Sequence, residues 1–120
     1  MTREEFQDCV ARALDGLPEE IAGRMENIAV VVRDLPTRRE LREARVRRKR
    51  SLLGLYTGVP LGWRGPHYGN VLPDRVVLYQ KNIEAAFPPE RLVQGIRDVL
   101  LHEIGHHFGL SDARLRRLGY

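Results

Sequence analysis

The amino-acid sequence predicts an α+β domain in which a small β-sheet is covered on one side by helices. Three observations lead to this prediction: an amphipathic helical segment opens the chain, strand-like segments follow at 27–32, 52–61 and 74–83, and a long helical segment comes near the end. A length of 120 residues fits one domain, residues 1–120, with one modest hydrophobic core. The sequence contains no internal repeat and no low-complexity segment.

Composition and cysteine usage exclude several classes of protein. Hydrophobic residues make up 42% of the chain and charged residues 30%, which is typical of globular proteins rather than disordered or membrane proteins. The first ten residues, MTREEFQDCV, lack the apolar core of a signal peptide, and no run of about eighteen apolar residues predicts a spanning helix. The single cysteine, Cys9, cannot form an internal disulfide, as expected in a reducing compartment. We therefore predict a cytoplasmic protein without a membrane partner.

The first helix is predicted over residues 3–15. Thr2 followed by Glu5 has the pattern of a capping box, and Gly16 is placed to end the helix. Cys9 lies on the apolar stripe of this helix and is expected to be a small core residue rather than a catalytic thiol. The stripe consists of the apolar residues at positions 6, 9, 10, 13, 14 and 17.

A short helix and three strands are expected next. Pro18 can open a helix that runs to about Met25. The segment NIAVVV, residues 27–32, is a β-branched run that suits a strand buried on both faces. The segments LLGLYTGVPL, residues 52–61, and DRVVLYQKNI, residues 74–83, predict two further strands.

Glycine and proline make the separator GWRGPHYGNVLP, residues 62–73, a loop that is long for a hairpin. Trp63 and Tyr68 flank His67 in this loop. Aromatic side chains on a loop can grip a substrate or cap the core, and we expect His67 to be exposed.

Most of the positive charge lies in one segment. The net charge is +4, but residues 38–50, RRELREARVRRKR, hold eight basic and two acidic residues, whereas the rest of the chain has a net charge of −2. Such a segment can contact nucleic acid or an acidic partner. No recognised DNA- or RNA-binding motif accompanies it, so we expect a partly helical, solvated segment, and nucleic acid is not the expected partner.

The last long helix carries the residues with the clearest chemistry. It is expected from Pro89 to Phe108, after two prolines that stop the preceding chain. His102 and His106 lie one helical turn apart, and Glu103 shares their face. At this spacing two ring nitrogens can converge on one zinc ion at about 2.0–2.1 Å, with the glutamate beside the open position of the metal.

A third ligand can come from the chain that follows this helix. Gly109 can adopt the positive φ that ends a helix and turns the chain sharply. Asp112 could then supply a third protein ligand and leave the fourth position to water, as in catalytic zinc sites. Alternatively, Asp112 or Ser111 is the N-cap of the next helical segment, ARLRRLG.

The segments LLGLYTGVPL, LPDRVVLYQKNIE and above all HEIGHHFGLSDARLRRLGY resemble the small bacterial zincin-like metallopeptidase domains, minimal relatives of the metzincins, and the resemblance covers nearly the whole chain. It implies a pattern His-Glu-x-x-His-x-x-Gly-x-x-Asp in which His102, His106 and Asp112 bind one zinc per chain and Glu103 is the general base. The fold implied is a minimal zincin-like one, with a small mixed sheet packed on an N-terminal helix and an active-site helix. The activity implied is zinc-dependent hydrolysis of a peptide or protein substrate.

The resemblance also has consequences for the substrate path and the floor of the site. In larger zincins the edge strand pairs with an extended peptide, and the strand around Val76 to Gln80 is the candidate here. Larger metzincins have a methionine-containing turn beneath the metal, but Met25 is the last methionine of this chain. Their lower half, which walls the substrate cleft, also has no counterpart here.

Several alternatives remain open at this stage. A second group that stabilises the oxyanion could be Tyr56, His67, His107 or Tyr120, although His107 is expected to be a satisfied, partly buried histidine. A purely structural zinc would call for four protein ligands, whereas this sequence offers three. The remaining alternative is an inactive zincin scaffold that binds a partner or nucleic acid through residues 38–50.

Overall fold

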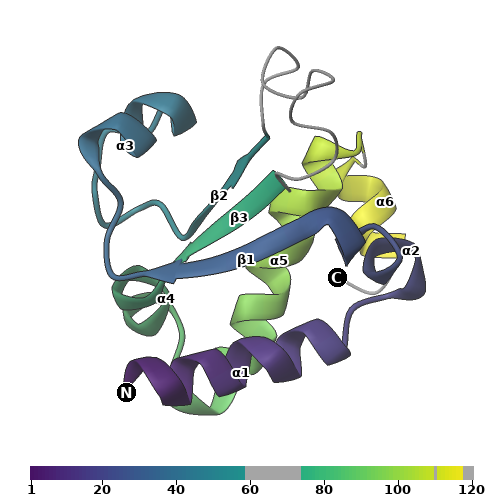
Figure 1. Cartoon of the computed structure of the whole chain (residues 1–120), viewed down its shortest axis with the longest axis horizontal. Coiled ribbons are helices and arrows are strands. Elements are labelled where there is room, and N and C mark those ends of the chain that lie inside the picture. The colour runs from purple at the N-terminus through teal and green to yellow at the C-terminus, as the bar shows by residue number, and fades with distance from the viewer. Residues whose placement is uncertain (59–73, 110, 118–120) are drawn as a thin grey trace, which may run out of the picture.

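The computed structural model describes residues 1–58, 74–109 and 111–117, apart from the side chains of Asp112 and Leu115. The predicted α+β class is confirmed (Figure 1). The helices are α1 (Arg3–Asp15), α2 (Glu19–Ala22), α3 (Arg38–Ala44), α4 (Gln80–Ala86), α5 (Leu92–His107) and α6 (Asp112–Arg117), with short 3-10 turns η1 (Met25–Asn27) and η3 (Pro89–Arg91). The strands are β1 (Ile28–Arg33), β2 (Gly54–Thr57) and β3 (Asp74–Tyr79).

The sheet is mixed, and its strand order is β1-β3-β2. Strand β1 pairs with β3 in parallel, and β2 pairs with β3 antiparallel. The prediction that the strand around Val76 to Gln80 lies at the edge is wrong, because β3 is the central strand. The reason is its composition: consecutive apolar residues from Val76 to Tyr79 are fully buried on both faces, which only a central strand allows. Strand β1, expected to be buried on both faces, is instead a half-buried edge strand.

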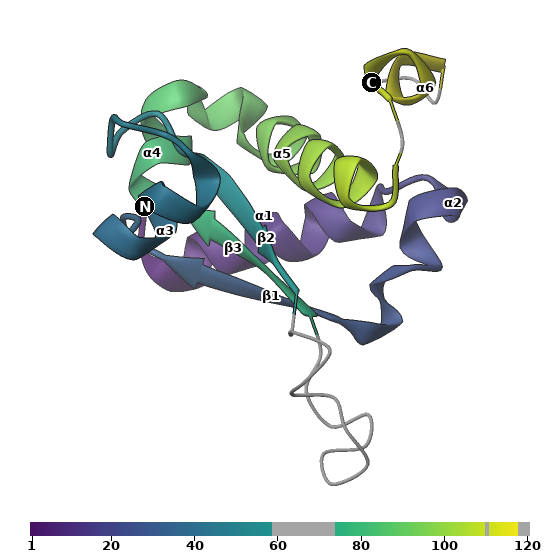
Figure 2. The same ribbon diagram turned by 90° about the horizontal axis from the view of Figure 1, so that it is seen from above.

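Helices α1 and α5 build the main core on one face of the sheet. Figure 1 shows α1 below the sheet and α3 above it, and Figure 2 shows α5 alongside the strands. This core includes Phe6 and Val10 of α1, Val76 and Leu78 of β3, and a row of buried residues on α5. The main core residues on α5 are Leu92, Ile96, Val99, Leu100, Leu101 and Ile104.

The prediction that helices cover only one side of the sheet is wrong, because residues also pack against its second face. A smaller cluster joins Val77 and Tyr79 of β3 to Leu52. Leu41 of α3 and Val46, which follows that helix, pack against this cluster. The basic segment 38–50 is thus partly helical, as predicted, and its few apolar residues attach it to the sheet.

Local sequence signals place the first helix correctly. The Thr2 hydroxyl accepts a hydrogen bond from the Glu5 backbone N–H at 3.1 Å, and the Glu5 carboxylate accepts one from the Thr2 N–H at 2.9 Å, which completes the predicted capping box. Gly16 is the C-cap. Cys9 is half-buried and packs against the main core. The predicted span 3–15 is therefore confirmed.

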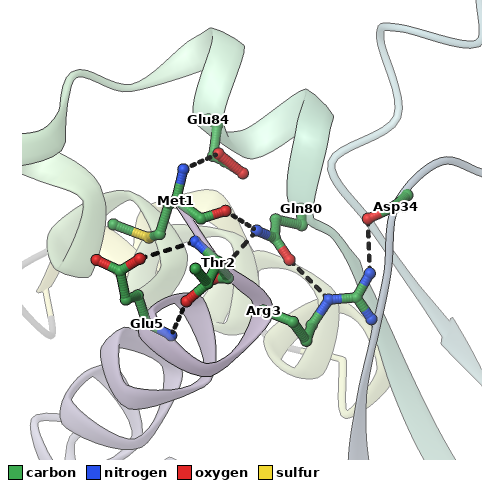
Figure 3. Close-up of polar contacts among 7 residues, drawn as sticks. All are labelled: Met1, Thr2, Arg3, Glu5, Asp34, Gln80 and Glu84. Carbon is green, nitrogen blue, oxygen red and sulfur yellow. Dashed lines mark hydrogen bonds and ion pairs between the residues drawn. The ribbon is translucent and has the colours of Figure 1, made fainter.

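The strand predicted at 74–83 ends early, because the chain turns into α4 at Gln80. Gln80 is only 4% exposed, and polar groups of the first three residues of the chain hold its side chain (Figure 3). It donates to the Met1 carbonyl oxygen at 3.1 Å and accepts from Arg3 Nε at 2.7 Å. Arg3 also donates to the Val32 carbonyl oxygen at 2.9 Å and to the Asp34 carboxylate at 2.6 Å, so the start of α1 is tied to the end of β1.

Replacing Gly95 by Ala is expected to lower the free energy of unfolding by about 1–3 kcal/mol. Alanine normally stabilises a helix interior by about 1 kcal/mol over glycine, but a Cβ at position 95 would lie 2.5 Å from atoms of the Phe87 ring. Chemical denaturation measures the effect. Gly23→Ala is a matched control, since residue 23 has a helical backbone conformation and its nearest neighbouring atom lies at 3.5 Å; a stabilised Gly95→Ala protein would contradict this packing.

No helix within the described ranges is long and apolar enough to cross a membrane.

Candidate metal centre

Helix α5 presents His102 and His106 to solvent on one face. Their ring centroids are 5.8 Å apart and the ring planes meet at 81°, so the two rings lie close together, as their one-turn spacing predicts. Both side chains are exposed, whereas Ile104 between them is fully buried. The apolar stripe of α5 holds the helix on the core, and this leaves the histidine face at the core's edge.

A hydrogen bond sets the orientation of the His102 ring. Its Nδ1 lies 2.8 Å from the carbonyl oxygen of Asp98, one turn earlier on α5. A carbonyl only accepts hydrogen bonds, so in the neutral ring Nδ1 carries the proton and Nε2 keeps its lone pair. Metal-binding histidines commonly donate the other ring N–H to a carbonyl or carboxylate in this way. The His102 ring is therefore oriented in the way that is common for a metal-binding histidine.

Glu103 lies beside the two histidines and is half-buried. Burial raises the pKa of its carboxyl above the ordinary value, and the charges of His106 and His102 lower it by a smaller amount. A carboxylate whose pKa is raised is a better proton acceptor near neutral pH than an ordinary glutamate. Position and environment both suit the role of a general base.

A cavity of about 380 Å³ opens beside His102 and Glu103. One wall is α5, with Asp98 and Val99 one turn before the histidine. Residues 51–54, at and before the start of β2, also line the cavity, as does Phe87. The lining is mostly apolar, so the cavity can take an apolar group next to the polar residues of α5.

The chain after α5 follows the predicted course. Gly109 has a φ of +78°, the left-handed conformation expected of a glycine that ends the helix and turns the chain. The Ser111 hydroxyl then accepts a hydrogen bond from the Arg114 N–H at 3.1 Å, so Ser111 is the cap of α6. Asp112 begins α6, and its side chain lies outside the described residues. Among the described side chains, no three His, Cys, Asp or Glu residues are grouped so that they could hold a metal ion.

The sequence model of the zincin-like metallopeptidase family matches residues 25–120. The chain belongs to this family. A comparison with curated proteins found no match. Zinc binding and peptide hydrolysis are general properties of zincins, and the histidines and glutamate of α5 lie within the matched segment.

In this zincin-like domain, His107 follows His106 on α5 but contacts a different element, strand β2. The prediction that His107 is partly buried is wrong, because its side chain is exposed. The His107 ring stacks on Tyr56 of β2, with ring centroids 3.8 Å apart and planes 16° from parallel. The Tyr56 hydroxyl donates to the Asp74 carboxylate at 2.7 Å. The stack therefore fastens the end of α5 to the edge strand β2.

Four other residues predicted for the site do not belong to the described part of the chain. His67, Trp63 and Tyr68 belong to the segment 59–73, and Tyr120 is beyond residue 117. Sequence reasoning missed the pairing of Tyr56 with His107 and the contact of His102 with the Asp98 carbonyl oxygen. Only the second had a local signal, because residues four apart on a helix face each other.

Proposed function

We propose that this zincin-like chain is a zinc-dependent metallopeptidase of the His-Glu-x-x-His-x-x-Gly-x-x-Asp type. His102, His106 and Asp112 hold one zinc per chain, and Glu103 is the general base. The observation that supports the proposal most is the hydrogen bond between His102 Nδ1 and the Asp98 carbonyl oxygen, because it presents Nε2 on the same exposed face as His106. The half-buried Glu103 lies beside them.

Each residue of the proposed site has its own part in the hydrolysis of a peptide bond. When bound, zinc supplies Lewis acidity, which lowers the pKa of water and polarises a carbonyl group. Glu103 takes the proton from the attacking water and delivers it to the leaving amine, and the raised pKa of its carboxyl suits both steps. The Asp98 carbonyl oxygen keeps the His102 ring in one tautomer and one orientation.

The substrate path follows from the position of β2. This strand is an edge of the described sheet, and the residues at its start line the cavity beside Glu103. An extended peptide can add to such an edge through backbone hydrogen bonds. A side chain of that peptide would then enter the cavity between β2 and α5, where Leu52, Leu53 and Val99 favour an apolar group.

Metal analysis and a hydrolysis assay test this function directly. The purified protein is expected to hold about one zinc per chain and to cleave an unstructured protein substrate. A chelator should remove both the zinc and the activity, and added zinc should restore them. A metal-free protein that takes up no zinc at neutral pH would contradict the proposal, and zinc uptake without hydrolysis would favour a scaffold that is not catalytic.

A further inference from the structure

Three consecutive cations form a tight turn before β2. The Ser51 backbone N–H donates to the Arg48 carbonyl oxygen at 3.0 Å, which closes a β-turn with Lys49 and Arg50 at its tip. The side chains of Arg48, Lys49 and Arg50, here called the basic turn, are all exposed. Within the described part of the chain, no carboxylate forms an ion pair with any of the three. Their charge is therefore available to an external anion.

A buried amide holds the basic turn in place. Asn82 of α4 is 1% exposed, and its Nδ2 donates to the Lys49 carbonyl oxygen at 2.7 Å and to the Leu52 carbonyl oxygen at 2.8 Å. Both hydrogen bonds go to the backbone, so they hold the turn whatever its side chains are. The three cations are thus presented from a fixed point on the core rather than from a loose segment.

The basic turn leads directly into the wall of the cavity beside the site. Ser51 and the three residues after it line this cavity, which also contacts His102 and Glu103. Arg50 precedes Ser51, and the Cα atoms of neighbouring residues are about 3.8 Å apart. Because charges act over about 8 Å at physiological salt, the basic turn adds positive charge next to a cavity that Asp98 and Glu103 also line.

We propose that the basic turn binds acidic side chains of the polypeptide substrate, so that the site prefers chains with a run of Asp or Glu next to the cleaved bond. This inference rests on the proposed peptidase function. A polypeptide is favoured over nucleic acid because the turn directly precedes Ser51, the first of the residues that line the cavity beside Glu103. The basic segment 38–50 also has no aromatic side chain on which bases could stack.

Equilibrium binding to a Glu103→Gln protein tests the proposal without interference from hydrolysis. The ligands are a labelled unstructured peptide with a run of Glu and the same peptide with Gln at each of those positions, and fluorescence anisotropy gives the dissociation constants. The acidic peptide is expected to bind about tenfold more tightly than its Gln counterpart. Replacing Arg48, Lys49 and Arg50 by Gln should remove that preference.

A matched control separates the position of the charges from their number. Replacing Arg12, Arg116 and Arg117 by Gln removes the same charge from exposed positions on α1 and α6, and the preference should remain. The basic-turn variant should keep its unfolding midpoint, because Asn82 bonds only to backbone groups.

Three results would overturn the inference: a basic-turn variant that retains the preference, a control variant that loses it equally, or a protein that binds duplex DNA more tightly than the acidic peptide. Failure of the peptidase function would be seen separately, as a parent protein that shows the preference in binding but cleaves neither peptide.

Discussion

Glu103→Gln is expected to lower the rate of peptide hydrolysis by ~10²–10⁴-fold while the zinc content stays at the parent's level. Glutamine has nearly the shape and size of glutamate, so the half-buried position next to His102 and His106 remains filled. It cannot take up a proton, however, and the general base is lost. The measurement is a side-by-side comparison of zinc per chain and hydrolysis rate for the parent and the variant.

Glu90→Gln provides the matched control for this prediction. Glu90 is an exposed glutamate in η3, immediately before α5, so the same chemical change occurs on the same segment but away from the histidines. Its rate and zinc content should equal those of the parent. An undiminished rate in Glu103→Gln would show that hydrolysis does not depend on this carboxylate, and the proposed mechanism would be wrong.

Asp112→Ala is expected to weaken zinc binding and to abolish hydrolysis with it. Loss of an outer-shell partner of a metal ligand typically costs ~10–100-fold in affinity, and loss of a ligand should cost more than that. Competition with a chromophoric chelator measures the zinc affinity of the variant against that of the parent. The experiment decides between the two roles that the sequence leaves open for this residue.

Ser111→Ala is the control from the adjacent position. The Ser111 hydroxyl caps α6, so its loss should destabilise that helix by about 1 kcal/mol without removing a zinc ligand. If Ser111→Ala lowers zinc affinity as much as Asp112→Ala does, the effect comes from the helix and not from ligation. An Asp112→Ala protein that binds zinc as tightly as the parent would contradict the third ligand.

Elements with local signals could be predicted from the sequence. The capping box of Thr2 and Glu5 and the glycine at position 109 place the start of α1 and the end of α5 where the structure has them. The order of strands has no such local signal. Strand β3 is central because β1 and β2 both pair with it, and this depends on contacts between segments far apart in the chain.

The candidate site also contains residues that the sequence could predict and contacts that it could not. His102, Glu103 and His106 could be predicted because helical periodicity alone places them on one face. The stack of His107 on Tyr56 and the bonds from Asn82 to the basic turn could not, since each joins residues that only the tertiary fold brings together. The end of the strand at Gln80 could not be predicted for the same reason, because the partners of its amide are the first three residues of the chain.

The contact of Arg3 with the end of β1 also bears on self-association. A β-branched edge strand such as Ile28–Arg33 offers its backbone to strands of other molecules, and natural proteins protect such edges with charged groups. The Arg3 guanidinium occupies the Val32 carbonyl oxygen and places a cation at the end of that edge, where Asp34 holds it. Arg3, at the start of a helix that fills the core, therefore leaves less of the β1 backbone open to a strand of another molecule.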